Sequence, residues 1–569
     1  MKRLFILTGL LLLTGALFNR TIAQNRENQV REQSIKYQRL MAYIDAFYVD
    51  TVNLQKLTED AIIKALSDLD PHSVYITKEE VDEMNEPLEG GFFGIGIQFT
   101  ILRDTLAVVA IVPGGPSEKA GLMAGDRIVS VDGENIAGKK LSNTEVRKRL
   151  KGEEGTIVKV GVLRGHENMD FRIIRGKIPI YSIDATYMLD KTTGYIKLSR
   201  FAATTIDEFE EAVKKLQAQG MKDLILDLQT NGGGYMGAAI GIADHLLDGR
   251  KMIVYTDGVN SGRREEYSTP IGLLQGGRVV VLIDGNSASA SEIFAGAIQD
   301  NDRGTIVGRR SFGKGLVQQP IDFSDGSAIR LTIARYYTPS GRCIQRPYES
   351  GKDSKYEMDW LTRYEHGEFF SKDSIKLDEN LRYSTGLGRP VYGGGGIMPD
   401  VFVPQDTTGV SSYLIEVSNR GLIIQFSFQY TDRNRAKLSA FENEQDLLKY
   451  LRRQGIVEQF IRFADSKGVK RRNLLIHRSY KLLERNLYGN IIYNTLGKEA
   501  YIRYINESDA TVKKALEILE RGEAFPKAPL QTGQEEDNNN NGKEKRTAQA
   551  YSITEDPTRG FNYAKAAIS

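Results

Sequence analysis

The sequence predicts a multidomain α/β protein in which an α/β core carries an inserted β-rich domain and is flanked by helical regions. Between residues 180 and 350, apolar runs of strand length alternate with helical stretches, which indicates a largely parallel sheet covered by helices. Residues 88–176 instead combine short strands with glycine-rich turns. Apolar residues recur at helical spacing before residue 85 and again beyond residue 350, so helices are expected at both ends.

Composition narrows the range of possible functions. The chain has 569 residues, of which 76 are Lys or Arg and 74 are Asp or Glu. A net charge of +2 gives no reason to expect a nucleic-acid partner. The single cysteine, Cys343, cannot form an intramolecular disulfide and has no histidine near it in the sequence, so it is a weak candidate for a nucleophile.

Residues 1–23 have the pattern of a secretory signal peptide. A basic start, Met1-Lys2-Arg3, precedes an uncharged, Leu-rich run over residues 4–18, and Ala23 lies at the expected cleavage point. The run is shorter than the ~20 residues that a membrane-spanning helix needs. We therefore expect an exported, periplasmic protein cleaved after Ala23. The alternative is an uncleaved segment that associates with the membrane and anchors the protein to the inner membrane.

The rest of the chain divides into five predicted regions. They are a helical region at 24–87, a β-rich domain at 88–176, the α/β core at 177–405, a mainly helical region at 406–530 and a disordered tail at 531–569. The tail is polar and charged and contains four consecutive Asn residues at 538–541, a composition that cannot bury enough apolar surface to fold. Residues 350–530 as a whole are expected to be mostly helical.

One candidate nucleophile follows a buried strand of the core. The strand 279–283 ends in a turn rich in Gly, Asn and Ser, and a helix is expected to begin near Ser289. Unpaired N–H groups at the start of a helix can hold the oxyanion of a tetrahedral intermediate. The alternative is that these serines cap an ordinary helix, and the turn alone does not decide between the two.

Lysine is the stronger candidate for the base that would activate Ser289. None of the five histidines lies in a motif near this turn, so a Ser-His-Asp triad has no positive support. Lys314 lies between two glycines that allow close backbone approach, and Gln318 could orient its amine. The pKa of a free lysine, ~10.4, would have to fall by about three units for Lys314 to act at neutral pH, and desolvation can supply such a shift.

A second glycine-rich turn, 229–234, follows the buried strand 224–228. Both turns would lie at the carboxyl ends of parallel strands, where sites form in α/β sheets. Gly233 could then offer an oxyanion N–H beside that of Ala290. The alternative is a plain helix-entry turn.

These residues resemble the carboxy-terminal processing peptidases, also called tail-specific proteases. The segments that carry the resemblance are Ser-Ala-Ser-Ala-Ser-Glu at 287–292, Phe-Gly-Lys-Gly with the following Gln318, and stretches at 69–73, 116–126, 331–342 and 395–401. The resemblance implies that Ser289 is the nucleophile, Lys314 the general base and Gln318 its support, on a crotonase/ClpP-like core. It also implies a serine endopeptidase that cleaves near the C-termini of exported proteins and needs no metal or cofactor.

The same resemblance identifies residues 88–176 as a PDZ domain with Gly94, Ile95 and Gly96 as its carboxylate-binding loop. PDZ domains bind an extended peptide by adding it as a strand, so the expected partners are proteins or peptides with accessible C-terminal tails. The oligomeric state is not determined by the sequence.

The second glycine-rich turn departs from the family pattern. The family usually has Leu-Arg-x-Asn-Pro-Gly-Gly, whereas this chain has Leu-Gln-Thr-Asn-Gly-Gly-Gly at 228–234 and keeps Gly233. Gly232 lacks the fixed φ of proline, so this turn is expected to be more flexible.

Two alternatives belong to other classes of protein. One is a PDZ scaffold with an inactive core, which the joint presence of Ser289, Lys314 and Gln318 disfavours. The other is an acyl-CoA enzyme of crotonase-like fold, which the PDZ segment and the lysine disfavour.

Overall fold

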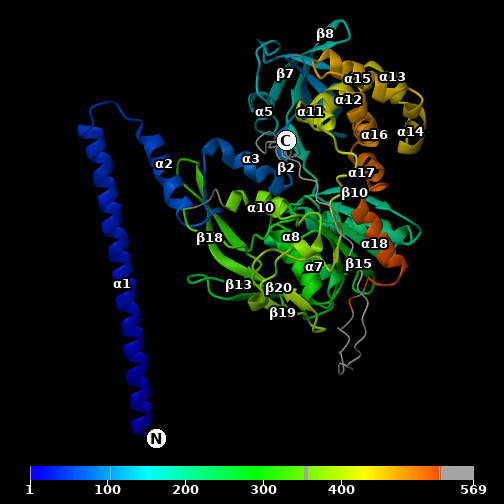
Figure 1. Ribbon diagram of the computed structural model, residues 1–569. Helices are drawn as coiled ribbons and strands as arrows, with labels where there is room; N and C mark the ends of the chain where they lie inside the picture. Colours follow the sequence, from blue (N-terminus) through cyan, green and yellow to red (C-terminus); the bar gives the residue numbers. More distant parts are fainter. Residues whose placement is uncertain (1, 103, 352–355, 525, 527–569) are drawn as a thin grey trace, which may run out of the picture. The chain divides into compact units, whose positions relative to one another are not determined.

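The computed structural model describes residues 2–102, 104–351, 356–524 and 526, and the predicted disordered tail, 531–569, lies outside them. The chain, drawn in Figure 1, forms two compact units. The first unit comprises 1–77, 319–331 and 348–353, and the second comprises 78–318, 332–347 and 354–569. Strands β17 (Leu316–Asp322) and β18 (Ala328–Tyr337) pass from one unit to the other.

The first unit contains helices α1 (Lys2–Phe47) and α2 (Leu54–Ser67) and a short strand, β1 (Val74–Ile76). This strand interrupts residues 24–87, which are otherwise mainly helical. The Asp70 carboxylate accepts the N–H groups of His72 and Ser73 over 2.8 and 2.9 Å, which stabilises a turn after α2. The chain then pairs antiparallel with residues 328–330 of β18.

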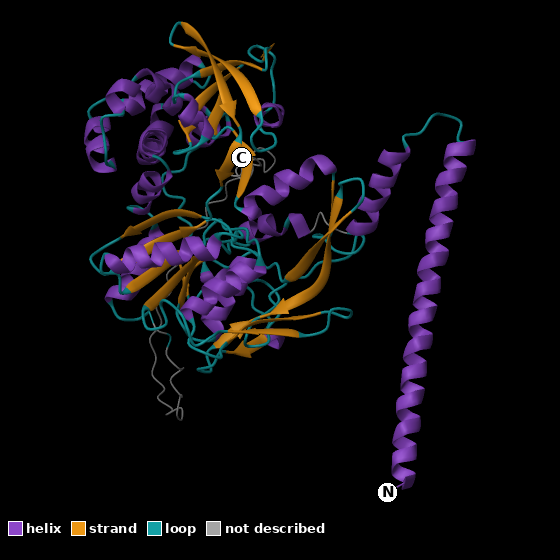
Figure 2. Cartoon of the chain, turned by 180° about the vertical axis from the view of Figure 1, so that it is seen from behind, coloured by secondary structure: helices purple, strands orange, loops and turns teal. Residues whose placement is uncertain are grey.

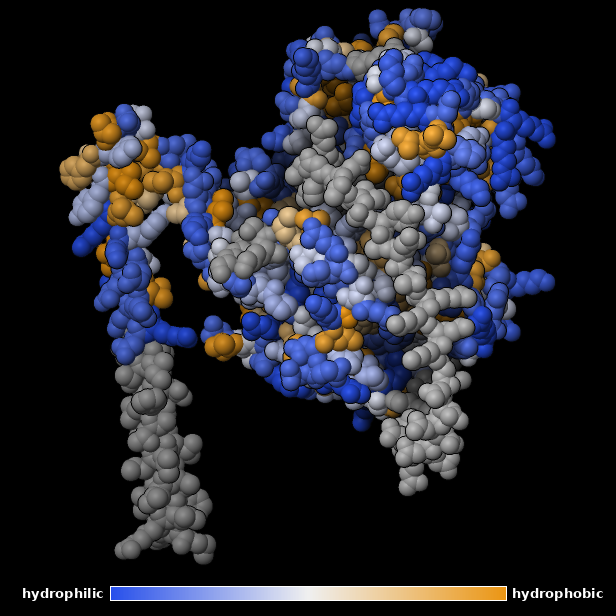
Figure 3. Space-filling view, viewed as in Figure 1, coloured by the Kyte–Doolittle hydropathy of each residue, from blue (hydrophilic) through white to orange (hydrophobic). Residues whose placement is uncertain are grey.

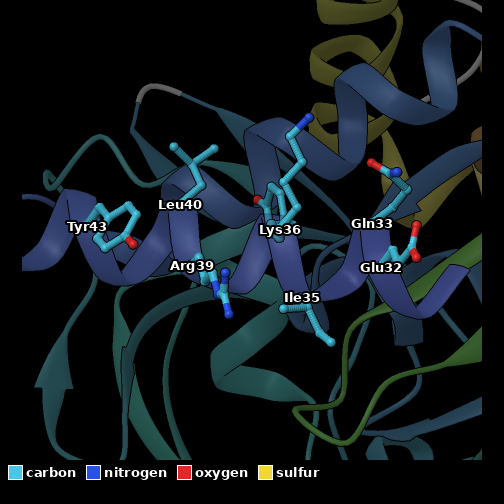
Figure 4. Close-up of a pocket in the computed structure, with 8 residues that line it drawn as sticks. Glu32, Gln33, Ile35, Lys36, Arg39, Leu40 and Tyr43 are labelled. Atoms are coloured by element: carbon cyan, nitrogen blue, oxygen red, sulfur yellow. The ribbon is translucent and has the colours of Figure 1, made fainter. Parts of the chain in front are cut away.

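Helix α1 exposes many apolar side chains in its C-terminal half, and Figure 3 shows this hydrophobic surface. A depression of about 620 Å³ on α1 is lined by residues of this helix alone (Figure 4). Within the ranges that the structure describes, no helix combines the length and the hydropathy needed to cross a membrane.

The core of the second unit is a six-stranded sheet, visible in Figure 2. Its order is β10-β11-β12-β15-β16-β21. Only the β10–β11 pair is antiparallel, and the other four pairs are parallel, which confirms the predicted largely parallel sheet. The strands are β10 (Ile183–Met188), β11 (Thr193–Leu198), β12 (Asp223–Asp227), β15 (Arg278–Ile283), β16 (Thr305–Gly308) and β21 (Val401–Phe402).

Helices cover both faces of this sheet. Alternate residues of a strand point to opposite faces, so Val279 and Val281 pack in one buried cluster and Val280 and Leu282 in another. The first cluster contains residues of α6 (Thr205–Ala218), α7 (Met236–Leu246) and α8 (Ala290–Asp300), and the second contains residues of α17 (Lys498–Asn506) and α18 (Ala510–Glu520). The C-terminal helices thus complete the α/β core.

The β-rich domain consists of a separate, antiparallel sheet and two helices. Its strand order is β3-β4-β5-β7-β8, with β6 paired to β5, so β3 is an edge strand of this sheet. A separate antiparallel pair is formed by β2 (Gly91–Gly94) and β9 (Gly176–Pro179), which lie at the two ends of the domain's sequence. The elements are β3 (Ile97–Leu102), β4 (Thr105–Ile111), α4 (Pro116–Ala120), β5 (Arg127–Val131), β6 (Glu134–Asn135), α5 (Asn143–Leu150), β7 (Ile157–Arg164) and β8 (Glu167–Ile174).

The expectation that residues 350–530 are mostly helical is wrong for their first part. Up to residue 405 the described residues form mainly loops, because glycines at 393–396 and prolines at 390 and 399 interrupt helices. The elements here are α10 (Asp359–Glu365), η1 (Lys372–Ser374), η2 (Glu379–Leu381), β19 (Arg382–Ser384), β20 (Pro390–Tyr392) and β21. The loop ends at β21, which joins the core sheet beside β16.

The remaining elements are an outer strand pair, one more helix of the second unit and the C-terminal helical region. Strand β13 (Met252–Asp257) pairs with β14 (Arg264–Tyr267) and with residues 335–337 of β18. Helix α3 (Lys78–Glu89) precedes the β-rich domain. The C-terminal helices are α11 (Ser412–Asn419), α12 (Leu422–Arg433), α13 (Arg435–Leu438), α14 (Glu444–Arg452), α15 (Ile456–Ser466) and α16 (Asn473–Leu496), which share one buried apolar cluster.

Candidate active site

The two glycine-rich turns meet at the carboxyl ends of β12 and β15. These strands are parallel neighbours, with Asp227 opposite Leu282. The carbonyl oxygen of Asn231 accepts the N–H of Ala288 over 3.0 Å and the hydroxyl of Ser291 over 2.9 Å. The turns are therefore joined by hydrogen bonds as well as by the sheet.

The three serines of the second turn have different surroundings. Ser287 and Ser291 are fully buried, and the Ser287 hydroxyl donates to the carbonyl of Leu228 over 2.8 Å. Ser289 is only partly buried and has φ 55° and ψ −114°. A non-glycine residue at positive φ costs of order 1–3 kcal/mol and is held there by its surroundings. Ser287 and Ser291 therefore stabilise the turn. Of the three serines, Ser289 alone is partly exposed and has a strained backbone, just before α8.

A buried carboxylate organises this backbone. Glu292, with an exposed fraction of 0%, lies in the first turn of α8. Its Oε2 accepts the N–H groups of Ser289 and Lys314, each over 2.9 Å, and its Oε1 accepts the Gly313 N–H over 2.7 Å and the Ser311 hydroxyl over 2.5 Å. Burial raises the pKa of Glu292 from its ordinary 4.5 to about 7, while the donated hydrogen bonds oppose this rise. One carboxylate thus connects the serine turn to the lysine loop.

A second connection comes from the opposite direction. The hydroxyl of Tyr336, on β18, lies 3.1 Å from the carbonyl oxygen of Ser289 and 2.5 Å from that of Lys314. Burial raises the pKa of Tyr336 well above its ordinary value, so this phenol stays protonated and can donate. Tyr336 contacts the carbonyl groups of Ser289 and Lys314, and Glu292 binds their N–H groups. Together they fix the position of one backbone segment relative to the other.

The Lys314 side chain is oriented by Gln318. Its Nζ donates to Gln318 Oε1 over 2.9 Å, and both side chains are partly buried. The next residue, Gly315, donates its N–H to Gln345 Oε1 over 2.7 Å, and a Cβ at Gly315 would lie 2.8 Å from the Gln345 backbone nitrogen. This close approach explains why glycine follows the lysine.

The structure places Gly233 beside the serine. A Cβ at Gly233 would lie 2.8 Å from the Ser289 Cβ and 3.0 Å from the Ala290 nitrogen. The Gly233 N–H, however, donates to the side chain of Asn231 over 2.9 Å. Gly233 and Ala290 are therefore both adjacent to Ser289, but in this state the Gly233 N–H is already engaged.

The three residues predicted to bind a peptide carboxylate join β2 to β3. Gly94 ends β2, Ile95 is 2% exposed, and Gly96 has φ 76°. The carbonyl of Ile95 accepts the Ser117 N–H over 2.9 Å, and that of Gly96 accepts the Val112 N–H over 3.0 Å. All three line a cavity of about 1000 Å³ that extends along the edge strand β3.

Cys343 has the chemistry expected of a structural thiol. Burial raises its pKa above the ordinary value of 9.0, which disfavours the thiolate that a nucleophilic cysteine requires.

Sequence reasoning missed three residues of this site. Glu292 carried a signal, because a glutamate three residues after a serine at a helix start has the spacing of a capping box. For Asn231 the sequence shows only a place in a glycine-rich turn. Tyr336 lies within a segment that resembled the family, but its contact with Ser289 spans 47 residues, and nothing in the local pattern predicts it.

Comparisons with known proteins agree with this architecture. The model of peptidase family S41 matches residues 192–351, and that of the PDZ domain matches 94–174. A family of unknown function, DUF8443, matches 413–497.

Two curated relatives and one solved structure are similar to this chain. A carboxy-terminal-processing protease of Bartonella bacilliformis is 35% identical over 352 residues, which cover 60% of this chain and 80% of that protein. The carboxy-terminal processing protease CtpB of Bacillus subtilis is 31% identical over 350 residues, 61% of this chain and 72% of that protein. The photosystem II D1 C-terminal processing protease has 28% identity, covers 65% of this chain and 92% of its own, and gives a TM-score of 0.33.

The fold and its matches define a serine-type peptidase with a PDZ domain. The chain belongs to the carboxy-terminal processing protease family.

Proposed function

We propose that this chain is an exported endopeptidase that uses a Ser289–Lys314 dyad to cut peptide bonds near the C-termini of exported proteins. The observation that carries the proposal is the arrangement around Glu292, which fixes the backbones of both residues through one carboxylate oxygen. Gln318 adds a fixed acceptor for the Lys314 amine.

The reaction begins with proton transfer. The uncharged Lys314 amine takes the proton of the Ser289 hydroxyl as the Ser289 oxygen attacks the scissile carbonyl carbon. The resulting ammonium then protonates the leaving amine, and an acyl-enzyme forms. Water, activated by the same amine, hydrolyses the acyl-enzyme and restores the free hydroxyl.

The negative oxygen of the tetrahedral intermediate needs donors. The N–H of Ala290, at the first position of α8, is one of the helix N–H groups without an intrahelical acceptor. Gly233 lies close enough to supply a second donor, but its N–H first has to leave the Asn231 side chain. We infer that substrate binding accompanies a small rotation of the 231–233 turn, which Gly232 in place of proline facilitates.

Substrate recruitment is assigned to the PDZ domain. The edge strand β3 and the loop 94–96 line the same cavity, so an extended tail could pair with β3 and place its carboxylate at the loop. The substrates would be proteins or peptides with accessible C-terminal tails.

Mass spectrometry of cleavage products tests the dyad. Purified protein would be incubated with a denatured protein substrate, alongside Ser289→Ala and Lys314→Ala. Cleavage should disappear in both variants and persist in the matched controls at exposed positions, Ser439→Ala and Lys372→Ala. Cleavage that is unchanged in either dyad variant rejects the dyad, and the absence of cleavage in the wild type supports an inactive PDZ scaffold instead.

Export is tested separately. Cell fractionation and N-terminal sequencing of the mature protein should find a periplasmic chain that begins after Ala23. A mature chain that retains residues 1–23 in the membrane fraction would support the anchored alternative, and a cytoplasmic chain would contradict export.

A further inference from the structure

The cavity along β3 has a wall that does not belong to the PDZ domain. On one side it is lined by β3 and α5, and on the other by residues of α12 and α16. Both helices fall within or beside the segment matched by the family of unknown function, 413–497. In Figure 1, α12 and α16 lie next to the β-rich domain, and Figure 2 shows the same neighbours from behind.

Specific contacts hold this wall against the PDZ domain. Arg127, on β5, forms an ion pair with Asp432 of α12, and both side chains are 23% exposed. The Arg127 guanidinium also lies 5.8 Å from the ring centroid of Phe428. On the groove side, the Tyr493 hydroxyl of α16 donates to Gln98 Oε1 of β3 over 3.3 Å. Both helices of the wall therefore contact the PDZ domain directly.

The wall presents apolar surface to the cavity. Ile424, one turn before Phe428 on α12, lines the cavity and is 58% exposed. A peptide that binds along the edge strand could bury this exposed apolar side chain. Tyr493 adds an amphipathic side chain on the same side of the cavity.

We propose that α12 and α16 form the second half of the peptide-binding groove and select substrate tails by their apolar residues upstream of the C-terminus. The occupant is an extended peptide with a free carboxylate, paired with β3. Successive side chains of a strand point to opposite sides, so one alternate set faces α5 while the other reaches Ile424 and Tyr493. This inference rests on the proposed recruitment of tails by the PDZ domain.

The groove explains why a helical region accompanies the PDZ domain in this chain. A PDZ domain alone reads the carboxylate and alternate side chains on one side of the peptide. A wall on the other side adds contacts to the remaining side chains, so more of the tail sequence contributes to discrimination.

The test is peptide binding by the full chain carrying Ser289→Ala, which prevents cleavage. The probes are three fluorescent decapeptides: one with apolar upstream residues and a free carboxylate, one with alanine at those upstream positions, and one with an amidated end. In this background Ile424→Ser is compared with Leu474→Ser, the same kind of apolar-to-polar change at an 88% exposed position of α16 outside the cavity. Ile424→Leu provides the conservative replacement.

Fluorescence anisotropy should show that Ile424→Ser raises the Kd of the apolar peptide about tenfold, while the Kd of the alanine peptide changes less than twofold. Ile424→Leu and Leu474→Ser should leave both values unchanged. If the apolar peptide has the same Kd in Ile424→Ser and in its parent, while amidation still weakens binding, the role of the wall is refuted and PDZ recruitment stands. No binding of any probe overturns recruitment and the wall together, without affecting the dyad.

Discussion

Ser289 and Lys314 donate their backbone N–H groups to the same oxygen of one carboxylate, Glu292 Oε2, over 2.9 Å each. This carboxylate is fully buried and lies one helical turn beyond the serine. The relative position of the two residues is thus fixed through backbone contacts, which leaves both side chains to the chemistry.

Glu292→Gln should lower kcat by about 10²-fold, the cost of a small misplacement of reacting groups. The amide offers one acceptor oxygen where the carboxylate offers two, and its NH₂ group would face backbone N–H donors. KM should change little, because tail recruitment does not depend on Glu292. Steady-state kinetics on a peptide substrate measure both constants, with Glu365→Gln at an exposed position as the control. A wild-type kcat in Glu292→Gln would contradict a positioning role.

The stability contributed by Glu292 should depend on pH. Burial raises its pKa from 4.5 to about 7, so the folded protein retains a proton that the unfolded chain releases. The contribution is fully present below pH 4.5 and is lost as the pH rises through about 7. The free energy of unfolding of the wild type minus that of Glu292→Gln should therefore fall over this window, by at most about 1.4 kcal/mol per pH unit.

Urea denaturation of both proteins, monitored by hydrogen exchange in α8, gives this difference in the free energy of unfolding at each pH. Glu292→Gln serves as the reference for the wild type because the glutamine amide does not titrate. A difference that is constant from pH 4.5 to 7, or one that grows, would show that Glu292 is not protonated in this range.

Gly233→Ala should abolish activity and destabilise the core. Its Cβ would lie 2.8 Å from both the Ala288 carbonyl oxygen and the Ser289 Cβ, and its φ of 103° is strained for alanine. Gly237→Ala in α7 is the matched control, since nothing lies within 4 Å of that Cβ, and alanine in a helix is favoured by up to about 1 kcal/mol. Thermal melts and product assays should separate the two variants, and an active Gly233→Ala enzyme would refute the proposed oxyanion turn.

Gln318→Glu should shift the acid limb of the pH–rate profile to higher pH. A carboxylate in contact with the Lys314 amine favours the ammonium form, so a higher pH is needed to free the base. The adjacent Gln319→Glu adds the same charge at an exposed position, on the opposite side of the strand, and should shift the profile much less. Equal shifts in the two variants would indicate a general charge effect rather than contact with the base.

Most of the core and most elements of the site could be predicted from the sequence. Buried strands over 224–228 and 279–283, each followed by a glycine-rich turn, sufficed to predict parallel neighbours whose turns meet. Local pattern also placed the helix after Ser289, because a turn ending in small polar residues preceded apolar residues at helical spacing.

The remainder depends on contacts between distant parts of the chain. Arg127 and Asp432 are 305 residues apart, so no periodicity could place α12 beside the PDZ domain. The loop from 356 to 400 lacks regular elements over most of its length and is fixed by partly buried ion pairs, such as Arg389 with Asp302 and Asp400. The occupied N–H of Gly233 is likewise a tertiary detail, set by the rotamer of Asn231.

The central claim is that the Lys314 amine, uncharged, removes the proton of the Ser289 hydroxyl. The most direct measurement is the rate at which a serine-directed electrophile acylates Ser289, followed by mass spectrometry of the intact protein from pH 5 to 10. If Lys314 is the base, modification should occur at Ser289 alone, the rate should rise with an apparent pKa below the ~10.4 of a free lysine, and the reaction should be lost in Lys314→Ala. Acylation at the wild-type rate in Lys314→Ala would contradict this claim.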